Sequence, residues 1–287
     1  MKKLLVVLSM IATFSVATAF AQQSAQTEAP PAQSNLPSAA TPQAANPPAD
    51  PHTAKARAKI DQMIQALGGQ AYLTYKSKDE AGRTYGFYQG QPRGGITLYW
   101  RMWKYPDKER VEVTKQRDVA YLYVGDAGYE ITYKGTSVQE ADQLADYIRR
   151  RDHSMEIVLR QWLSDPKTLV LPAGTGLAEQ KLCDLVNIVA ANNDSVTIAI
   201  DQITHLPVQK LFTYRDQYKY KVEEAEVFAN YRLEGGIMTP FSWTRKKDGL
   251  MLTQRFINTI SYNVEIPDSK FDAKVTYDPF DLQHKKK

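Results

Sequence analysis

The chain has 287 residues, of which 36 are Lys or Arg and 32 are Asp or Glu, so its formal net charge at pH 7 is +4. With 43% apolar residues, 24% charged residues and a single cysteine, the composition excludes a collagen-like, a disulfide-rich and a wholly disordered chain. So small a net charge also argues against the broad basic surface that nucleic-acid binding needs.

The first 21 residues have the three parts of a secretory signal peptide. Lys2 and Lys3 form a positive start, residues 4–16 are mostly apolar, and residues 19–21 read Ala-Phe-Ala, a small-x-small cleavage site. The apolar run is shorter than the roughly 20 residues that a membrane helix needs. The residue after the cleavage site is Gln22 and no cysteine lies near it, so a lipid anchor of the bacterial lipoprotein type is not expected. The sequence predicts a signal peptide over residues 1–21 and a secreted, periplasmic protein.

Residues 22–51 form a second distinct segment, built almost entirely of Gln, Ala, Pro, Ser, Thr and Asn. Leu36 is its only large apolar side chain, so the segment cannot bury enough surface to offset the entropy of ordering. We expect a disordered spacer, which either holds a folded domain away from a membrane or wall or is a solvated leader without a role. Residues 52–287 are then long enough for a single folded domain, and the lysine run 285–287 is expected to be its solvated tail.

The domain begins with a helical pattern followed by a series of strands. Between residues 53 and 67, Ile60, Met63, Ile64 and Leu67 fall at i, i+3, i+4 and i+7, and a Gly-Gly pair follows, which predicts an amphipathic helix with a glycine cap. The next segments are rich in aromatic and β-branched residues and are separated by short turns, which is typical of an antiparallel meander. The strands expected here are 71–75, 83–88, 96–105, 109–115, 120–124 and 128–133.

Helical spacing returns after residue 135. Apolar residues recur at that spacing from Ala141 to Trp162, which predicts one helix, or two helices with a kink near Asp152. Strands are then expected at 181–190, 195–201, 208–214, 219–231, 238–246, 250–263 and in a short piece near Phe271.

The fold class expected from this pattern is mainly β with helices. About a dozen antiparallel strands in one sheet avoid long exposed edges by curling. The sequence therefore predicts a strongly curved, half-closed barrel with helices packed into or across its concave side.

The sequence contains no local signature of catalysis. The four histidines are far apart, and no HExxH, CxxC, GxSxG or glycine-rich phosphate loop is present. Cys183 is expected to be a small buried side chain on a strand, and His205 is expected to pack in a turn. We therefore predict no enzymatic activity, no catalytic residue, no metal site and no cofactor.

The strand at 96–105 is apolar on both of its faces. Leu98, Trp100 and Met102 alternate with Tyr99 and Trp103, so each face needs something to cover it. One face can be covered by the helices while the other lines a cavity or meets a partner, although a core on both sides fits the pattern equally well.

Several short patterns, taken in their order and spacing, resemble the periplasmic lipoprotein-sorting (LolA/LolB-like) superfamily. The similarity is spread over most of residues 54–273. The patterns are the first helix with Gly68-Gly69, Tyr105-Pro106-Asp107-Lys108-x-Arg110, the segment from Ile200 to Lys210 with its Leu206-Pro207 pair, Phe228-x-x-Tyr231, Gly236-Ile237-x-x-Pro240, Ile260-x-x-Asn263 and Ile266-Pro267-Asp268-x-x-Phe271. The resemblance implies an unclosed β-barrel of about eleven strands, plugged by helices, whose apolar cavity in this family receives acyl chains.

Two functional hypotheses follow. The first is a periplasmic protein that holds a lipid, a lipoprotein acyl chain or another apolar ligand in the half-barrel, as in outer-membrane lipoprotein sorting, without covalent chemistry. Its candidate ligand-binding residues are Trp100, Met102 and Trp103 in the wall and Met155, Leu159 and Trp162 on the helical plug. The alternative is an envelope protein-interaction or sensor module with a filled barrel and no ligand.

The expected partners differ between these hypotheses. The first predicts a lipid or a lipidated protein, and the second predicts an envelope protein. In both cases nucleic acid is not expected, contact with a membrane is at most peripheral, and the protein is expected to be a monomer.

Overall fold

The computed structural model describes residues 51–278. The chain divides into two units, residues 1–47 and 48–287, and every described element belongs to the second. The predicted signal peptide, nearly all of the predicted spacer and the lysine run 285–287 lie outside the described residues. Within residues 51–278, no helix is both long and apolar enough to cross a bilayer.

The described part begins with the predicted amphipathic helix, α1 (Pro51–Leu67). Its buried residues include Ile60, Met63 and Leu67, as the apolar spacing requires. The helix ends at Gly68 and Gly69, which both have positive φ, and the amide N of Gly69 donates to the carbonyl O of Ile64 at 2.8 Å. This is the glycine cap that the sequence predicts. A second short helix, α2 (Gln70–Thr74), follows directly.

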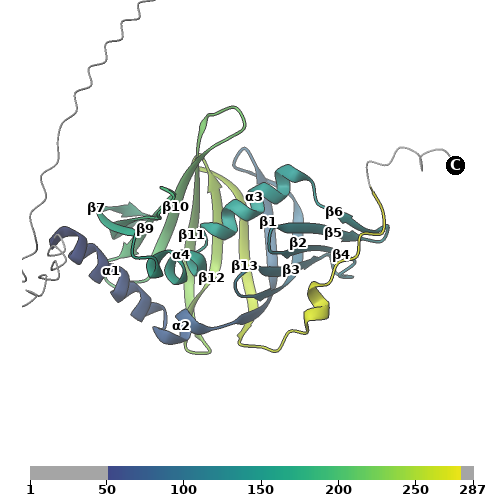
Figure 1. Ribbon diagram of the computed structural model, residues 1–287, viewed down its shortest axis with the longest axis horizontal. Helices are drawn as coiled ribbons and strands as arrows, with labels where there is room; N and C mark the ends of the chain where they lie inside the picture. The colour runs from purple at the N-terminus through teal and green to yellow at the C-terminus, as the bar shows by residue number, and fades with distance from the viewer. Residues whose placement is uncertain (1–50, 279–287) are drawn as a thin grey trace, which may run out of the picture. The chain divides into compact units, whose positions relative to one another are not determined.

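The strands of residues 51–278 form a single antiparallel sheet of thirteen strands (Figure 1). Its order is β6-β5-β4-β3-β2-β1-β13-β12-β11-β10-β9-β8-β7, so the first and last strands of the meander meet at β1 and β13 while β6 and β7 form the two edges. The sheet does not close, and the predicted fold class, a curved and unclosed barrel with helices, is confirmed. The strands are β1 (Ser77–Tyr88), β2 (Gln91–Lys104), β3 (Lys108–Val113), β4 (Val119–Val124), β5 (Ala127–Thr132), β6 (Gly135–Val138), β7 (Leu169–Ala178), β8 (Lys181–Val189), β9 (Ser195–Asp201), β10 (Pro207–Arg215), β11 (Lys221–Glu234), β12 (Ile237–Lys247) and β13 (Leu250–Tyr262).

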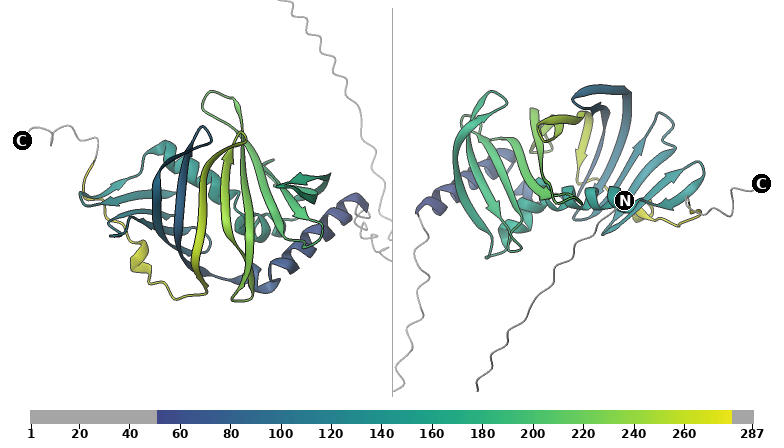
Figure 2. Two further views of the ribbon diagram at one scale, coloured as in Figure 1. Left: turned by 180° about the vertical axis from the view of Figure 1, so that it is seen from behind. Right: turned by 90° about the horizontal axis from the view of Figure 1, so that it is seen from above.

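The helical segment between β6 and β7 consists of two helices, which is one of the two arrangements expected from the sequence. Helix α3 (Ala141–Asp152) ends at His153, and α4 (Met155–Arg160) begins after Ser154, whose Oγ accepts a hydrogen bond from the amide N of Ile157 at 3.3 Å. Figures 1 and 2 show α1, α3 and α4 on one face of the sheet, with the strands curving around them. A short 3₁₀ helix at Trp162–Ser164 leads into β7.

The largest core lies between these helices and the concave face of the second half of the sheet. Ile60 and Met63 of α1 and Val158 of α4 pack with Ile188, Ile198 and other residues of β7 to β10. On the convex face of the first half, a smaller cluster joins Leu122 to Ile266 and Phe271 of the C-terminal segment. Helices α1 and α4 therefore fill one end of the trough. Its middle is covered by α3 and the start of α4.

Two predicted strands are wrong, and two strands were not predicted. Residues 71–74 lie in α2 and not in a strand, and Tyr72 and Tyr75, three residues apart at the end of this helix, are both buried. The piece near Phe271 is a 3₁₀ helix and not a strand. Strands β6 and β7 were not expected, so the sheet has more strands than the roughly eleven that the resemblance implies. The sequence of β7 contains Pro172, Gly174 and Gly176, which are unfavourable in a strand interior.

Candidate ligand cavity

A cavity of about 320 Å³ lies under the junction of α3 and α4, against the concave face of the central strands. This volume is at the lower end of the range for small-molecule sites. Its wall combines side chains from β1, β2, β11, β12 and β13 with side chains from α2, α3 and α4. The cavity therefore joins segments from both halves of the domain, and no single stretch of the sequence encodes it.

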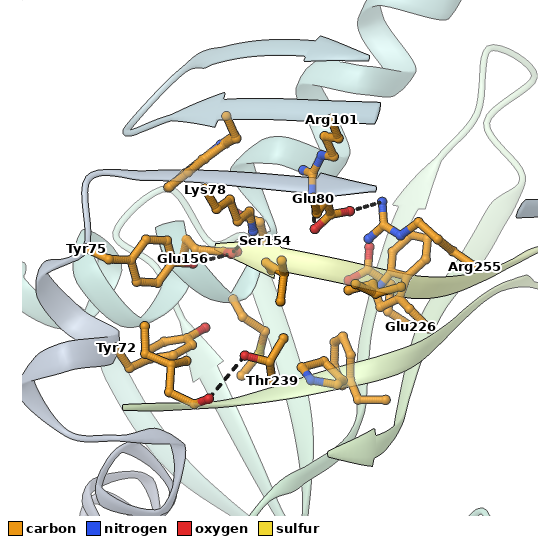
Figure 3. Close-up of a pocket in the computed structure, with 18 of the residues that line it drawn as sticks. Tyr72, Tyr75, Lys78, Glu80, Arg101, Ser154, Glu156, Glu226, Thr239 and Arg255 are labelled. Atoms are coloured by element: carbon orange, nitrogen blue, oxygen red, sulfur yellow. Dashed lines mark hydrogen bonds and ion pairs between the residues drawn. The ribbon is translucent and has the colours of Figure 1, made fainter. Parts of the chain in front are cut away.

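One end of the cavity is aromatic (Figure 3). The ring of Tyr75, just after α2, lies 4.8 Å from the ring of Tyr262, 5.6 Å from Trp103 and 6.0 Å from Tyr72, measured between centroids. The Tyr262 hydroxyl is 2.8 Å from Oγ1 of Thr239 on β12. Such tilted and edge-to-face rings offer a large apolar surface, while the hydroxyl groups of Tyr75 and Tyr262 are hydrogen-bonded.

A buried carboxylate anchors α4 to this aromatic end. Oε1 of Glu156 accepts hydrogen bonds from Nζ of Lys78 and from the hydroxyl of Tyr75, each at 2.7 Å. Burial alone would raise the pKa of Glu156, but Lys78, these two hydrogen bonds and Arg160 together hold that pKa far below its usual value of 4.5. Glu156 is therefore ionised and fully paired, and it closes the cavity without offering a free charge to a ligand.

The other end of the cavity is charged. The cavity expected from the sequence is apolar and has no charged end. Arg101 lies opposite Glu80 in the register of β1 and β2, and its guanidinium binds both carboxylate oxygens of Glu109 at 2.8 and 3.0 Å. The hydroxyl of Tyr147 on α3 donates to the same Glu109 carboxylate at 3.2 Å. Burial of Glu109 favours the neutral acid, but Arg101 keeps the pKa of this carboxyl group below its usual value.

The charged end continues across β11, β12 and β13. Glu226 lies between Lys210 and Arg245 in the strand register, and its carboxylate pairs with Nζ of Lys210 at 2.6 Å. Arg255 on β13 faces Glu80 from the other side, with a nitrogen-oxygen distance of 3.6 Å, and its guanidinium lies over the ring of Trp243 at 4.4 Å. We call Arg101, Glu80, Arg255, Arg245, Glu226 and Lys210 the charged row. Figure 3 shows Glu80 between Arg101 and Arg255 at the end of the cavity away from Tyr72 and Tyr75.

The six predicted ligand-binding residues lie in three different places. Trp103 and Met155 line the cavity, and Leu159 and Trp162 belong to the core around it, where Leu159 also borders a second pocket of about 300 Å³ between α1 and α4. Binding by these residues stays a prediction.

Trp100 and Met102 lie on the opposite face of β2 from Trp103. Met102 packs in the cluster of Leu122, Ile266 and Phe271, and the Trp100 ring is 4.1 Å from the guanidinium of Arg117. Neither residue lines the cavity, so their placement in its wall is wrong: the C-terminal segment packs on Met102, and Arg117 lies over Trp100.

The charged row was not predicted from the sequence, although the strands contain a signal for it. Arg101 lies two residues from Tyr99 and Trp103, Arg245 two residues from Trp243, and Arg255 two residues from Ile257. Each arginine is therefore on the same strand face as side chains that line the concave face or its core. A charged residue in phase with the buried positions of a strand indicates an internal site.

The residues considered for other chemistry lie away from the cavity. Cys183 is completely buried, and burial raises the pKa of its thiol, so it is a small core residue as expected. His205 lies in the turn between β9 and β10, where its amide N donates to the carbonyl O of Asp201 at 2.9 Å. Among residues 51–278, no three His, Cys, Asp or Glu side chains are grouped in a way that could hold a metal ion.

Comparisons with known proteins relate this architecture to solved structures. No protein-family model matches the chain, and a search of the curated proteins gives no significant match. A DUF1329 family protein from Desulfovibrio piger superposes with a TM-score of 0.53 at 13% identity, and a putative outer membrane lipoprotein-sorting protein domain from Vibrio parahaemolyticus with a TM-score of 0.52 at 9% identity. Each alignment covers 76% of this chain and 97% of the other.

At these identities the likeness concerns the fold. A LolA superfamily protein from Nitrosomonas europaea is also among the neighbours, with a TM-score of 0.48 at 11% identity. The fold that the resemblance implies is confirmed, because the sheet is unclosed and the domain superposes on the putative outer membrane lipoprotein-sorting protein domain named above.

Proposed function

We propose that this domain binds a lipid, or the acyl chain of a lipid-modified protein, in the cavity between its concave sheet and the helices α3 and α4. The observation that carries the proposal is the aromatic end of the cavity, where Tyr72, Tyr75, Trp103 and Tyr262 surround a space closed to bulk water on several sides. Each methylene of an acyl chain that moves from water into such a site contributes about 0.8 kcal/mol. Useful affinity therefore needs no covalent chemistry.

The fold and the N-terminal sequence support the same proposal. A putative lipoprotein-sorting domain shares the fold, and residues 1–21 have the pattern of a secretory signal peptide. We infer that the protein works in the bacterial envelope as a binding protein and not as an enzyme. The alternative of a filled barrel requires side chains to occupy the whole concave side, and the 320 Å³ cavity argues against it.

The proposal is tested by ligand uptake. The full-length protein, stripped of bound lipid, is titrated with a fluorescent long-chain fatty acid, and we expect saturable binding with a stoichiometry near one. Met238→Trp places a larger ring at a residue that lines the cavity and should weaken the binding. The matched control is Leu233→Trp, at an exposed residue that pairs with Met238 on the same hairpin and does not line the cavity.

Two results would contradict the proposal. One is a wild-type protein that takes up no fatty acid, and the other is a Met238→Trp variant that binds as well as the Leu233→Trp variant while both retain the circular dichroism spectrum of the wild type.

A further inference from the structure

The charged row crosses the concave face from β2 to β10 with an irregular sequence of charges. From Arg101 the signs alternate through Glu80 to Arg255, and from Lys210 they alternate through Glu226 to Arg245. The two alternating series meet at Arg255 and Arg245, which lie on the neighbouring strands β13 and β12. In that register Trp243 pairs with Arg255 and Arg245 pairs with Thr253, so the two arginines are diagonal neighbours with no carboxylate between them on these strands.

The other cations that line the cavity have close partners. Nζ of Lys78 is 2.7 Å from Glu156, Arg101 binds Glu109 at 2.8 Å, and Arg151 binds Asp126 and Asp152 at 2.9 Å each. Arg150 binds Asp146 within hydrogen-bond distance. These guanidinium and ammonium groups are therefore neutralised by the protein itself.

Arg255 and Arg245 are different. The nearest carboxylate oxygen is 3.6 Å from Arg255 and 3.8 Å from Arg245, beyond hydrogen-bond distance, although their side chains are only 21% and 19% exposed. The Nε atom of each is buried without a hydrogen-bond partner among residues 51–278. Burial and the nearby cation of Arg150 lower the pKa of Arg245, although Glu224, Asp146 and Glu226 act in the opposite direction.

We propose that Arg245 and Arg255 bind the anionic head group, a carboxylate or a phosphate, of an amphiphile whose chain occupies the aromatic end of the cavity. This inference rests on the proposed function and names the class of ligand. Both arginines line the same cavity as Tyr75 and Tyr262, and Figure 3 shows Arg255 at the end away from Tyr75. A guanidinium presents several donors in a planar fork, which matches the two oxygens of a carboxylate or phosphate.

The carboxylates in the same cavity do not argue against an anion. Glu109, Glu156 and Glu226 are each bound by a cation within 2.8 Å, and Glu80 lies between Arg101 and Arg255. Oε1 of Glu80 and Oε2 of Glu224 are also buried without a hydrogen-bond partner, but they lie 3.6 Å from Arg255 and 3.8 Å from Arg245, so a bound anion would supply closer acceptors than these carboxylates do. Buried donors without acceptors are costly, so the folded protein gains by binding one.

The test compares two ligands that share a chain and differ in the head. The full-length protein is titrated by calorimetry at pH 8 with dodecanoate and with dodecanol, both below their aggregation concentrations. We expect dodecanoate to bind at least about tenfold more tightly, because hydrogen bonds to a charged group contribute that much or more. Arg255→Gln and Arg245→Gln should each reduce this preference and leave the affinity for dodecanol nearly unchanged.

A matched variant and a further ligand complete the experiment. Arg83→Gln removes an exposed arginine that stacks on Phe256, the residue next to Arg255 and on the other face of β13, and it should keep the full preference. Inorganic phosphate and acetate separate a head-group site from a site for a free anion. Competition by either of them at micromolar concentration would overturn the assignment to an amphiphile.

The possible outcomes distinguish the two proposals. Equal affinity of the wild type for dodecanoate and dodecanol overturns the head-group site and leaves lipid binding intact, whereas failure to bind both ligands overturns the proposed function itself. Because the wild-type comparison needs no variant, it remains decisive if a substitution prevents folding. Arg255→Lys, which keeps the charge but not the fork, should retain part of the preference.

Discussion

At the scale of single residues, His153 shows how the α3–α4 junction is held against the sheet. Its ring stacks on Phe212, with centroids 4.3 Å apart, and meets the edge of Trp162 at 5.4 Å. Its carbonyl O accepts a hydrogen bond from the completely buried Nζ of Lys210 at 2.7 Å. Burial lowers the pKa of His153 below its ordinary value of 6.5, Lys210 lowers it further, and the hydrogen bond to the carbonyl O of Arg149 only partly opposes this.

This neutral imidazole predicts a dependence of stability on pH. Because the pKa is lower in the folded than in the unfolded chain, the unfolded chain takes up the proton first as the pH falls below 6.5. The contribution of the neutral ring to the free energy of unfolding is therefore complete above that pH and decreases below it. His153→Gln lacks this titration, so its stability should fall less between pH 7 and pH 5, with a slope smaller by up to about one proton.

The measurement is urea denaturation of the wild type and of His153→Gln at pH 7, 6 and 5. All other titrating groups are common to the two proteins, so the difference between their slopes isolates His153. Parallel slopes would show that the ring is not held neutral by its burial.

At the scale of elements, the end of α1 is locked to the β11–β12 turn by a close backbone contact. Gly68 has φ +122°, and a Cβ atom placed there would lie 2.4 Å from the carbonyl O of Gly236. Any side chain at this position therefore meets both backbone strain and a collision with another backbone segment. Gly68, one of the two glycines predicted to end this helix, therefore also sets how closely the helix approaches the sheet.

This contact makes Gly68→Ala a destabilising substitution. Gly94 provides the control, because it also has a positive φ (+75°) but has no heavy atom within 4 Å of the place that a Cβ would take. Gly94→Ala should cost about 1–2 kcal/mol for the backbone conformation alone, and Gly68→Ala should cost clearly more. Thermal and urea denaturation of the two variants measures the difference, and equal losses would exclude a role for the contact with Gly236.

The elements differ in how well the sequence predicts them. Helix α1 and most strands follow from the apolar spacing, because each buries one face against its neighbours. Strand β7 does not follow, since Pro172 and two glycines resemble a loop and its pairing with β8 is set by the sheet. Segment 71–75 contains aromatic residues that are typical of a strand, yet residues 71–74 lie in helix α2, which packs against α4. Tertiary contacts override the local preference here.

At the scale of the whole domain, the candidate site was less predictable than the fold. The alternation in residues 96–105 correctly placed Trp103 on a buried face, but it could not decide which face is concave. The residues of the charged row come from β1, β2 and the four strands β10 to β13. Arg255 and Glu80 become neighbours only when β1 and β13, the two ends of the meander, pair. Such long-range pairs leave only the weak signal of a charge in phase with buried residues.

The two edges of the sheet are protected in different ways. At β6, the C-terminal segment runs alongside the strand, where the amide N of Thr276 donates to the carbonyl O of Thr136 and Oγ1 of Thr276 accepts from the amide N of Thr136, each at 2.8 Å. At β7, Pro172 lacks an amide hydrogen, and α1 packs against the strand. Covered or interrupted edges of this kind prevent pairing with another chain.

Removal of the covering segment should therefore cause self-association. A chain that ends at Asp272 exposes the backbone of β6, and we expect it to form oligomers or aggregates at concentrations where a chain that ends at Asp278 remains monodisperse. Light scattering coupled to size-exclusion chromatography compares the two. Identical profiles would mean that the segment 273–278 does not protect this edge.

The gap between β6 and β7 also bears on the size of what the domain can hold. In a closed barrel the number of strands and their stagger fix the diameter. Here the edge strands are not bonded to each other, so the sheet can uncoil or tighten slightly while every ladder between neighbouring strands stays intact. We therefore expect the width of the trough to adjust to ligands of different size at little cost in hydrogen bonding between strands.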